Sequence, residues 1–203
     1  MLKKTILALA LVSALPGCTS LMATASGPEP VGSKPGERTL SMRVEDMSIE
    51  NTAEVNIYKA DPAFHDANIT VVSFYGSVLL VGQVQTDALK AKAADVVNQI
   101  AEVKQMHNEL TVGNSTYYLA RANDGVISTR IGTAMTFDPS YPSSRTKVKT
   151  VNGVVYIMGK LTKAEADRAV QIASSVSGVQ KIVKIVDYLP DPTPAAPAAQ
   201  PAQ

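Results

Sequence analysis

The sequence contains few of the residues on which most enzyme active sites depend. In 203 residues it has one cysteine, two histidines and no tryptophan. A single cysteine excludes an intrachain disulfide and a cysteine-based metal cluster. The formal net charge is only +1, so bulk charge does not indicate binding to nucleic acid. We therefore expect no catalytic residues, no metal site and no nucleic-acid partner.

The one cysteine lies at the end of a short apolar segment near the amino terminus. Two lysines are followed by eleven mostly apolar residues, 5–15, and the segment closes with Leu-Pro-Gly before Cys18. Eleven residues are too few to cross a bilayer, which takes about 20. The pattern predicts a lipoprotein signal peptide over residues 1–17, although an ordinary secretory signal with a chance cysteine is the alternative. In the lipoprotein, Cys18 carries diacylglycerol and an N-acyl chain, and no other cofactor is expected.

Two further segments have the composition of connecting chain. Residues 18–42 are rich in glycine, serine, proline and alanine and lack a periodic apolar pattern, which is typical of a flexible tether. Residues 190–203 combine proline and alanine with no bulky apolar residue. We expect that tail to be disordered or polyproline-like.

Between the tether and the tail, the sequence repeats at an offset of 77 residues. Gly76 aligns with Gly153, and Gly82 aligns with Gly159. In both copies a glycine turn separates two apolar segments, and the dipeptide Asn152-Gly153 is a strong signal for a β-hairpin. Each copy is therefore expected to contain two paired strands.

Helices are predicted on either side of each hairpin. We expect Asp46 and Asp124 to cap the helices that precede the hairpins. Thr162 and Glu165 form the pattern of a capping box at the start of a following helix, and Gly178 is expected to end that helix. Apolar residues at helical spacing predict the core-facing side of the preceding helices: Ile49, Ala53 and Ile57 in one copy, and Ile127, Ile131 and Met135 in the other.

With a third strand after the second helix, each copy reads helix, strand, strand, helix, strand. The predicted fold class is α+β, with a small sheet covered by two helices in each of two tandem domains. The predicted boundaries are residues 43–113 for the first domain and 122–189 for the second.

The densest parts of the repeat resemble a known family. The segment 78–82, Val-Leu-Leu-Val-Gly, and the segment 173–179, which ends in Ser-Gly-Val, are similar to the BON domain. Two such domains behind a lipidation signal resemble the dual-BON outer-membrane lipoproteins. The resemblance implies a non-enzymatic protein that is anchored by lipid in the outer membrane and faces the periplasm, since Thr19 rather than aspartate follows the cysteine.

The resemblance also implies a function. Family members are associated with binding anionic phospholipid through the second BON domain, with outer-membrane integrity and with division sites. The alternative is an adaptor that docks on envelope assembly or division proteins, or on the cell wall, and uses its lipid only as a tether.

Charge separates the two halves of the mature chain. Residues 18–113 carry seven Lys or Arg and twelve Asp or Glu, whereas residues 114–203 carry ten and six. A cation near an anionic membrane surface gains about 1 kcal/mol. The second domain is therefore the one expected to contact anionic lipid.

One helix of the second domain has a pattern suited to this contact. Apolar residues stand at both ends of a stripe with a cation between them, beside the core-facing stripe of the same helix. Alternatively, the apolar ends of the stripe pack on the other domain. The candidate lipid-binding residues from the two stripes are Val126, Ile127, Arg130, Ile131, Thr133 and Phe137.

Three basic residues alternate farther along the second domain. Arg145, Lys147 and Lys149 fall in a predicted strand, where residues two apart share a face. They either extend the basic surface or form a solvated face of the strand.

Overall fold

The structure is a computed structural model that describes residues 35–113 and 118–191. The predicted signal peptide, Cys18, most of the tether and nearly all of the tail lie outside the described residues. The first copy contains α3 (Leu40–Ala60), the short 3-10 helix η1 (Pro62–Asp66), β1 (Asn68–Phe74), β2 (Ser77–Val84), α4 (Asp87–Asn98) and β3 (Gln105–Val112). The second contains α5 (Tyr118–Phe137), η2 (Ser143–Arg145), β4 (Thr146–Val151), β5 (Val154–Leu161), α6 (Lys163–Ser174) and β6 (Lys181–Tyr188).

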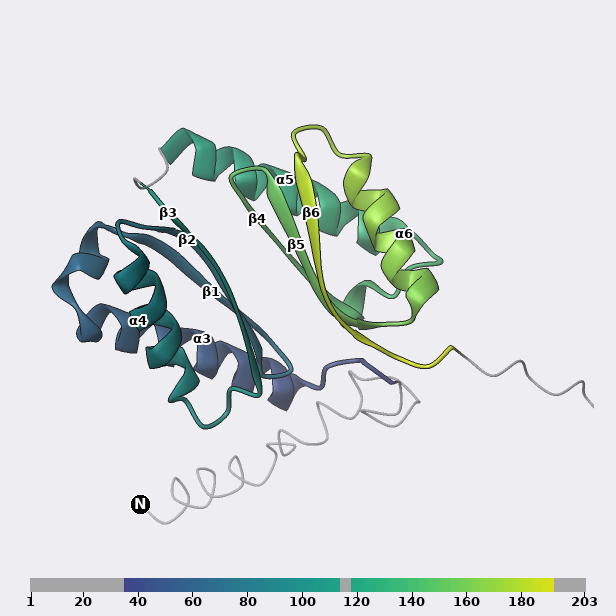
Figure 1. The fold of residues 1–203 in the computed structure, drawn as a ribbon. Helices are drawn as coiled ribbons and strands as arrows, with labels where there is room; N and C mark the ends of the chain where they lie inside the picture. The colour runs from purple at the N-terminus through teal and green to yellow at the C-terminus, as the bar shows by residue number, and fades with distance from the viewer. Residues whose placement is uncertain (1–34, 114–117, 192–203) are drawn as a thin grey trace, which may run out of the picture. The chain divides into compact units, whose positions relative to one another are not determined.

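Both copies have the predicted architecture, so the α+β class is confirmed. The first two strands of each copy pair antiparallel, and the third lies parallel to the second, which gives the strand orders β1-β2-β3 and β4-β5-β6. A parallel pair needs a crossover connection, which α4 and α6 provide. Two helices cover one face of each sheet, α3 and α4 in the first copy and α5 and α6 in the second (Figure 1).

The two hairpins turn as the glycine pattern predicts. Tyr75 and Gly76 both have positive φ, at 58° and 77°, and Asn152 and Gly153 have φ of 51° and 73°. Consecutive positive φ values are typical of the two-residue turn whose twist matches paired strands. The alignment of Gly76 with Gly153 therefore reflects a shared turn geometry.

The predicted roles of Asp46 and Asp124 as helix caps are wrong. Thr39 caps α3, its hydroxyl accepting a hydrogen bond from the backbone N–H of Met42, and Asp46 lies in the second turn of the helix. α5 begins no later than Tyr118, so Asp124 also lies inside its helix. Both helices therefore begin earlier than the boundaries at residues 43 and 122 that we predicted.

Each of these aspartates instead holds the hairpin turn of its own copy. Asp124 accepts hydrogen bonds from the backbone N–H groups of Asn152 and Gly153, at 2.7 and 2.9 Å. Asp46 accepts one from the backbone N–H of Gly76 at 3.2 Å. Both carboxylates are buried, where a turn with unsatisfied N–H groups is costly. The repeat thus preserves a contact between the first helix and the hairpin.

The ends of α6 are only partly as expected. Thr162 and Glu165 form the predicted capping box, in which each side chain accepts a hydrogen bond from the other residue's backbone N–H. The helix ends at Ser174 with Ser175 as its C-cap, so Gly178 is not the cap. Gly178 has a φ of 97° and turns the chain toward β6 three residues later.

Apolar side chains on the face of each sheet that the helices leave uncovered form one shared cluster. Phe74 and Leu79 of the first copy belong to the same buried cluster as Tyr156 and Met158 of the second. Both copies also fall within a single compact unit that begins at Gly36. Strands buried on both faces require nearly continuous apolar sequence, which explains the unbroken apolar stretch of β2 from Val78 to Val81.

Candidate functional site

The exposed side of α5 carries the candidate lipid-contact surface. Phe137 is 81% exposed and Val126 is 47% exposed, and neither belongs to a hydrophobic cluster of the fold. In the structure, therefore, these two side chains do not pack on the other domain, as the alternative required. Thr133 is also exposed.

Two of the six candidate residues do not belong to this surface. Ile127 and Ile131 are 1% and 0% exposed and lie in the core of the second copy. The prediction that either isoleucine contacts lipid is wrong, because the helix turns both side chains toward the sheet. Their place in the core is the one that the helical spacing predicted.

Sequence reasoning missed one member of the exposed surface. Leu119 is 80% exposed and lies seven residues before Val126 on the same helix. Residues seven apart share a helix face, so helical spacing could have identified Leu119. With it, the α5 surface consists of Leu119, Val126, Arg130, Thr133 and Phe137.

Arg130 is the cation of the α5 surface. Its side chain is exposed and makes no ion pair or hydrogen bond with any other part of the described chain. A guanidinium group in this state is available for a phosphate, to which it donates two parallel hydrogen bonds.

A carboxylate next to Phe137 does not leave an unpaired negative charge at the end of the surface. Asp138 accepts hydrogen bonds from Ser140 and from Arg168, the latter at 2.8 Å. The hydrogen bonds from the side chain and backbone of Ser140, followed by the one from Arg168, lower the pKa of Asp138. The group therefore stays ionised, and its charge is balanced by Arg168.

Most of the other cations in the second domain are occupied. Arg145 is not in the predicted strand but at the end of η2, where it pairs with Glu165. Lys147 of β4 pairs with Glu50 of the first copy. Of the three alternating basic residues, only Lys149 has no recorded partner, so they do not form a free basic strand face. The cations without an ion pair or hydrogen bond in the described part of the second copy are Arg130, Lys149, Lys163 and Lys181.

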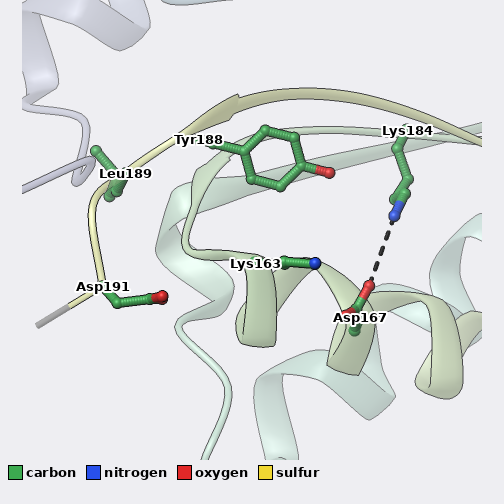
Figure 2. A pocket seen from close by; sticks show the side chains of 6 residues that line it. All are labelled: Lys163, Asp167, Lys184, Tyr188, Leu189 and Asp191. Carbon is green, nitrogen blue, oxygen red and sulfur yellow. Dashed lines mark ion pairs between the residues drawn. The ribbon is translucent and has the colours of Figure 1, made fainter.

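A hollow of about 430 Å³ lies between α6 and the end of β6. Figure 2 shows the amine of Lys184 directed at the carboxylate of Asp167, and the two groups are 3.6 Å apart. Two lysines and two aspartates give the hollow no excess charge, so it offers no preference for a charged ligand. The lining residues are Lys163, Asp167, Lys184, Tyr188, Leu189 and Asp191.

A metal-binding cluster and a membrane-spanning helix are both absent from residues 35–113 and 118–191. These residues contain no group of three or more histidine, cysteine, aspartate or glutamate side chains able to hold a metal ion. No helix within the same ranges is long and apolar enough to cross a membrane.

Comparison with known proteins identifies the family. The BON domain model matches residues 56–114 and 123–190. The chain is 29% identical over 196 residues to outer membrane lipoprotein DolP of Haemophilus influenzae, covering 93% of this chain and 97% of that one. It is 30% identical to the 21 kDa hemolysin of Actinobacillus pleuropneumoniae, over 75% of this chain and 78% of that one.

The chain is also similar to two more distant proteins. Osmotically-inducible protein Y of Escherichia coli is 26% identical over 89% of this chain and 93% of that one. The C-terminal domain of CdsD, a structural protein of the type III secretion system of Chlamydia trachomatis, is 17% identical over 71% of this chain and 67% of that one. The TM-score of this match is 0.29.

The matches confirm the predicted resemblance to dual-BON outer-membrane lipoproteins, together with the location that it implies. The chain belongs to the BON-domain family, as an outer-membrane lipoprotein with two BON domains in tandem.

Proposed function

We propose that this lipoprotein, anchored through acyl groups on Cys18 and facing the periplasm, binds anionic phospholipid through the α5 surface. Through this contact it helps to maintain the integrity of the outer membrane, with division sites as one place of action. The role is that of a binding protein and not of an enzyme.

The observation that carries this proposal is the composition of the exposed side of α5. Leu119, Val126 and Phe137 are exposed apolar side chains on one side of the helix, with the unpaired Arg130 between the last two. A helix with this pattern lies in the interface plane with its apolar side chains at the boundary of headgroups and acyl chains. Arg130 then lies at the depth of the phosphates.

Charge supports the same choice of domain. The second half of the mature chain has an excess of four positive charges, and the first half has an excess of five negative charges. Each cation near an anionic surface contributes about 1 kcal/mol, and each anion is repelled. The second domain therefore approaches an anionic bilayer more favourably than the first.

The first prediction concerns vesicle binding by the soluble fragment 19–203, which contains the whole compact unit that begins at Gly36. Replacing Arg130 by glutamate together with Phe137 by aspartate is expected to weaken binding to phosphatidylglycerol vesicles at least about tenfold. The pair removes one apolar contact and reverses one charge at the phosphates. Co-sedimentation with the vesicles measures the change.

A matched control carries the same change in net charge away from α5. Val112→Asp with Lys181→Glu alters one exposed apolar residue and one exposed lysine, and we expect binding to fall less than threefold. Equal losses in both double variants, or no loss in either, would contradict the assignment of α5. If the wild-type fragment does not co-sediment with anionic vesicles at all, the adaptor role is the better account.

A further inference from the structure

The helix α3 of the first domain carries an exposed apolar stripe that lies outside the hydrophobic clusters of the fold, and one member, Tyr58, stacks on the ring of His65 with the ring centroids 5.5 Å apart. Its members lie at spacings of four, three, four, four and three residues, which places them on one side of a helix. Asn51 is the only polar member, and the five apolar side chains are between 37% and 58% exposed. We call Leu40, Val44, Met47, Asn51, Val55 and Tyr58 the α3 stripe.

The α3 stripe lies opposite the side of the helix that packs in the core. The buried residues Ile49, Ala53 and Ile57 hold α3 on its sheet, and they are about half a turn away from the stripe. Soluble monomers rarely expose five large apolar side chains together on one helix. Such a patch marks an interaction surface.

Two opposite charges border the α3 stripe on the same flank. Arg43 and Glu54 are eleven residues apart, which is close to three whole turns, so they project in nearly the same direction. Neither has a hydrogen bond or ion pair within the part of the chain that the structure describes. The flank therefore carries one unpaired charge of each sign near opposite ends of the stripe.

We propose that the α3 stripe binds the α3 stripe of a second copy of this chain, in an antiparallel pair with two-fold symmetry. A two-fold axis perpendicular to both helices brings the same flank of each helix together. With the axis between Ser48 and Ile49, Arg43 of each copy lies beside Glu54 of the other. The arrangement therefore forms two ion pairs.

The same axis also places the apolar members together. Leu40 meets the second copy's Tyr58, Val44 meets its Val55, and Met47 lies close to its own symmetry mate. An arrangement that satisfies both charges and all five apolar side chains favours a second copy over an unrelated partner. An anionic bilayer is a poor alternative, because the first half of the chain has an excess of five negative charges.

The size of the contact predicts weak association. One pair of helices buries less than the roughly 1,200 Å² at which stable interfaces begin. We expect a dissociation constant of about 10 to 100 µM in solution. Anchoring two copies in one membrane raises their effective concentration, so the dimer is favoured where the lipoprotein resides.

Sedimentation equilibrium of the fragment 19–203 tests this second prediction. Met47→Asp is expected to weaken association at least about tenfold, because it places two carboxylates at the centre of the apolar contact. Val112→Asp, an exposed apolar residue outside α3, is the control and should leave association unchanged.

Charge exchange provides the sharper test. Arg43→Glu alone and Glu54→Arg alone should each weaken association about threefold to tenfold, since each places like charges together twice. The two changes in one chain reverse both ion pairs and should restore association to within about twofold of wild type.

Four results would overturn the proposal. The first is a fragment that stays monomeric up to about 1 mM, and the second is association that Met47→Asp does not weaken. The third is association that Val112→Asp weakens as much as Met47→Asp does. The fourth is a charge-exchanged double variant that associates no more tightly than its single variants. In a monomeric fragment, loss of binding to neutral phosphatidylcholine vesicles on Met47→Asp would identify a bilayer as the occupant instead. The α5 surface is not altered in any of these variants, so the outcome is separate from that of the lipid-binding test.

Discussion

Replacing Gly82 by alanine is expected to lower the free energy of unfolding by at least about 4 kcal/mol, enough to unfold the first domain in many conditions. Gly82 lies in the central strand β2 with a φ of 126°, and it pairs with Ile69 of β1. A β-carbon at this position would lie 1.8 Å from the carbonyl oxygen of Asn68. The backbone conformation alone costs a residue with a β-carbon about 1 to 3 kcal/mol, and the overlap forces the two strands apart.

Two other glycines supply a graded control. At Gly159, the position aligned with Gly82, a β-carbon would lie 2.8 Å from the carbonyl oxygen of Arg145, and φ is not positive. At Gly132, inside α5, no atom lies within 4 Å. Urea denaturation should rank the alanine variants in that order, with Gly132→Ala neutral or stabilised by up to about 1 kcal/mol. Equal stability of the Gly82 and Gly132 variants would show that the close approach is not real.

Replacing Asp46 by alanine is expected to cost about 3 kcal/mol of unfolding free energy. Its carboxylate accepts hydrogen bonds from Arg38 at 3.0 Å, from the hydroxyl of Ser73 at 2.8 Å and from the backbone N–H of Gly76 at 3.2 Å. Alanine leaves the three donors without this acceptor, and Arg38 is itself largely buried at 12% side-chain exposure. Urea denaturation at pH 7 measures the loss.

The same carboxylate makes stability depend on pH. Burial by itself raises the pKa of Asp46, but the hydrogen bonds from Ser73, Arg38 and the backbone N–H groups of Gly76 and Tyr75 outweigh it, so the pKa is lower than usual. A lowered pKa in the folded state adds stability above the unfolded value of about 4, and this stability is lost as the pH falls through the folded value. Asp46→Ala should therefore flatten the dependence of stability on pH below about 4.

An exposed aspartate in the same domain separates this effect from net charge. Asp66 lies on the surface at the end of η1, and Asp66→Ala removes the same charge as Asp46→Ala. We expect it to change stability by less than about 0.5 kcal/mol and to leave the dependence on pH intact. If both variants lose the same stability, the network around Asp46 contributes nothing specific.

Features encoded by neighbouring residues were predicted from the sequence. The hairpin turn at Asn152 and Gly153, the capping box of Thr162 and Glu165, and the core-facing residues of the helices each depend on spacings of a few residues. Such local signals do not depend on tertiary contacts, so the sequence alone reveals them. The repeat and the α+β architecture follow from the same signals.

Features that depend on distant contacts were not predicted. Asp46 and Asp124 stand where a helix cap is plausible, but their partners Gly76 and Gly153 lie about 30 residues farther along the chain. Likewise, the apolar stretch of β2 indicates a strand buried on both faces, but it does not show which residues cover the second face. Only the folded chain shows that these include Tyr156 of the second copy.

The candidate lipid surface was predicted in part for the same reason. Helical spacing selected Val126, Arg130 and Phe137 correctly as one stripe, and all three are exposed. The same spacing placed Ile127 and Ile131 on the core-facing side of the helix, where the structure buries them, so their inclusion among the lipid contacts was wrong. Spacing alone also did not distinguish the exposed α3 stripe from an ordinary solvated helix face.

The central claim is that α5 of the second domain, and not its counterpart in the first, rests on anionic lipid. A polarity-sensitive fluorophore on a cysteine at Thr133, in the fragment 19–203 that lacks Cys18, tests it directly. The control position is Thr52 on α3, an exposed residue outside the α3 stripe. The helices that precede the hairpins align at an offset of 78 residues, as Asp46 does with Asp124, so Thr52 matches Arg130. With phosphatidylglycerol vesicles we predict a blue shift of emission at position 133 and none at position 52. No shift at position 133, or an equal shift at both positions, would contradict the claim.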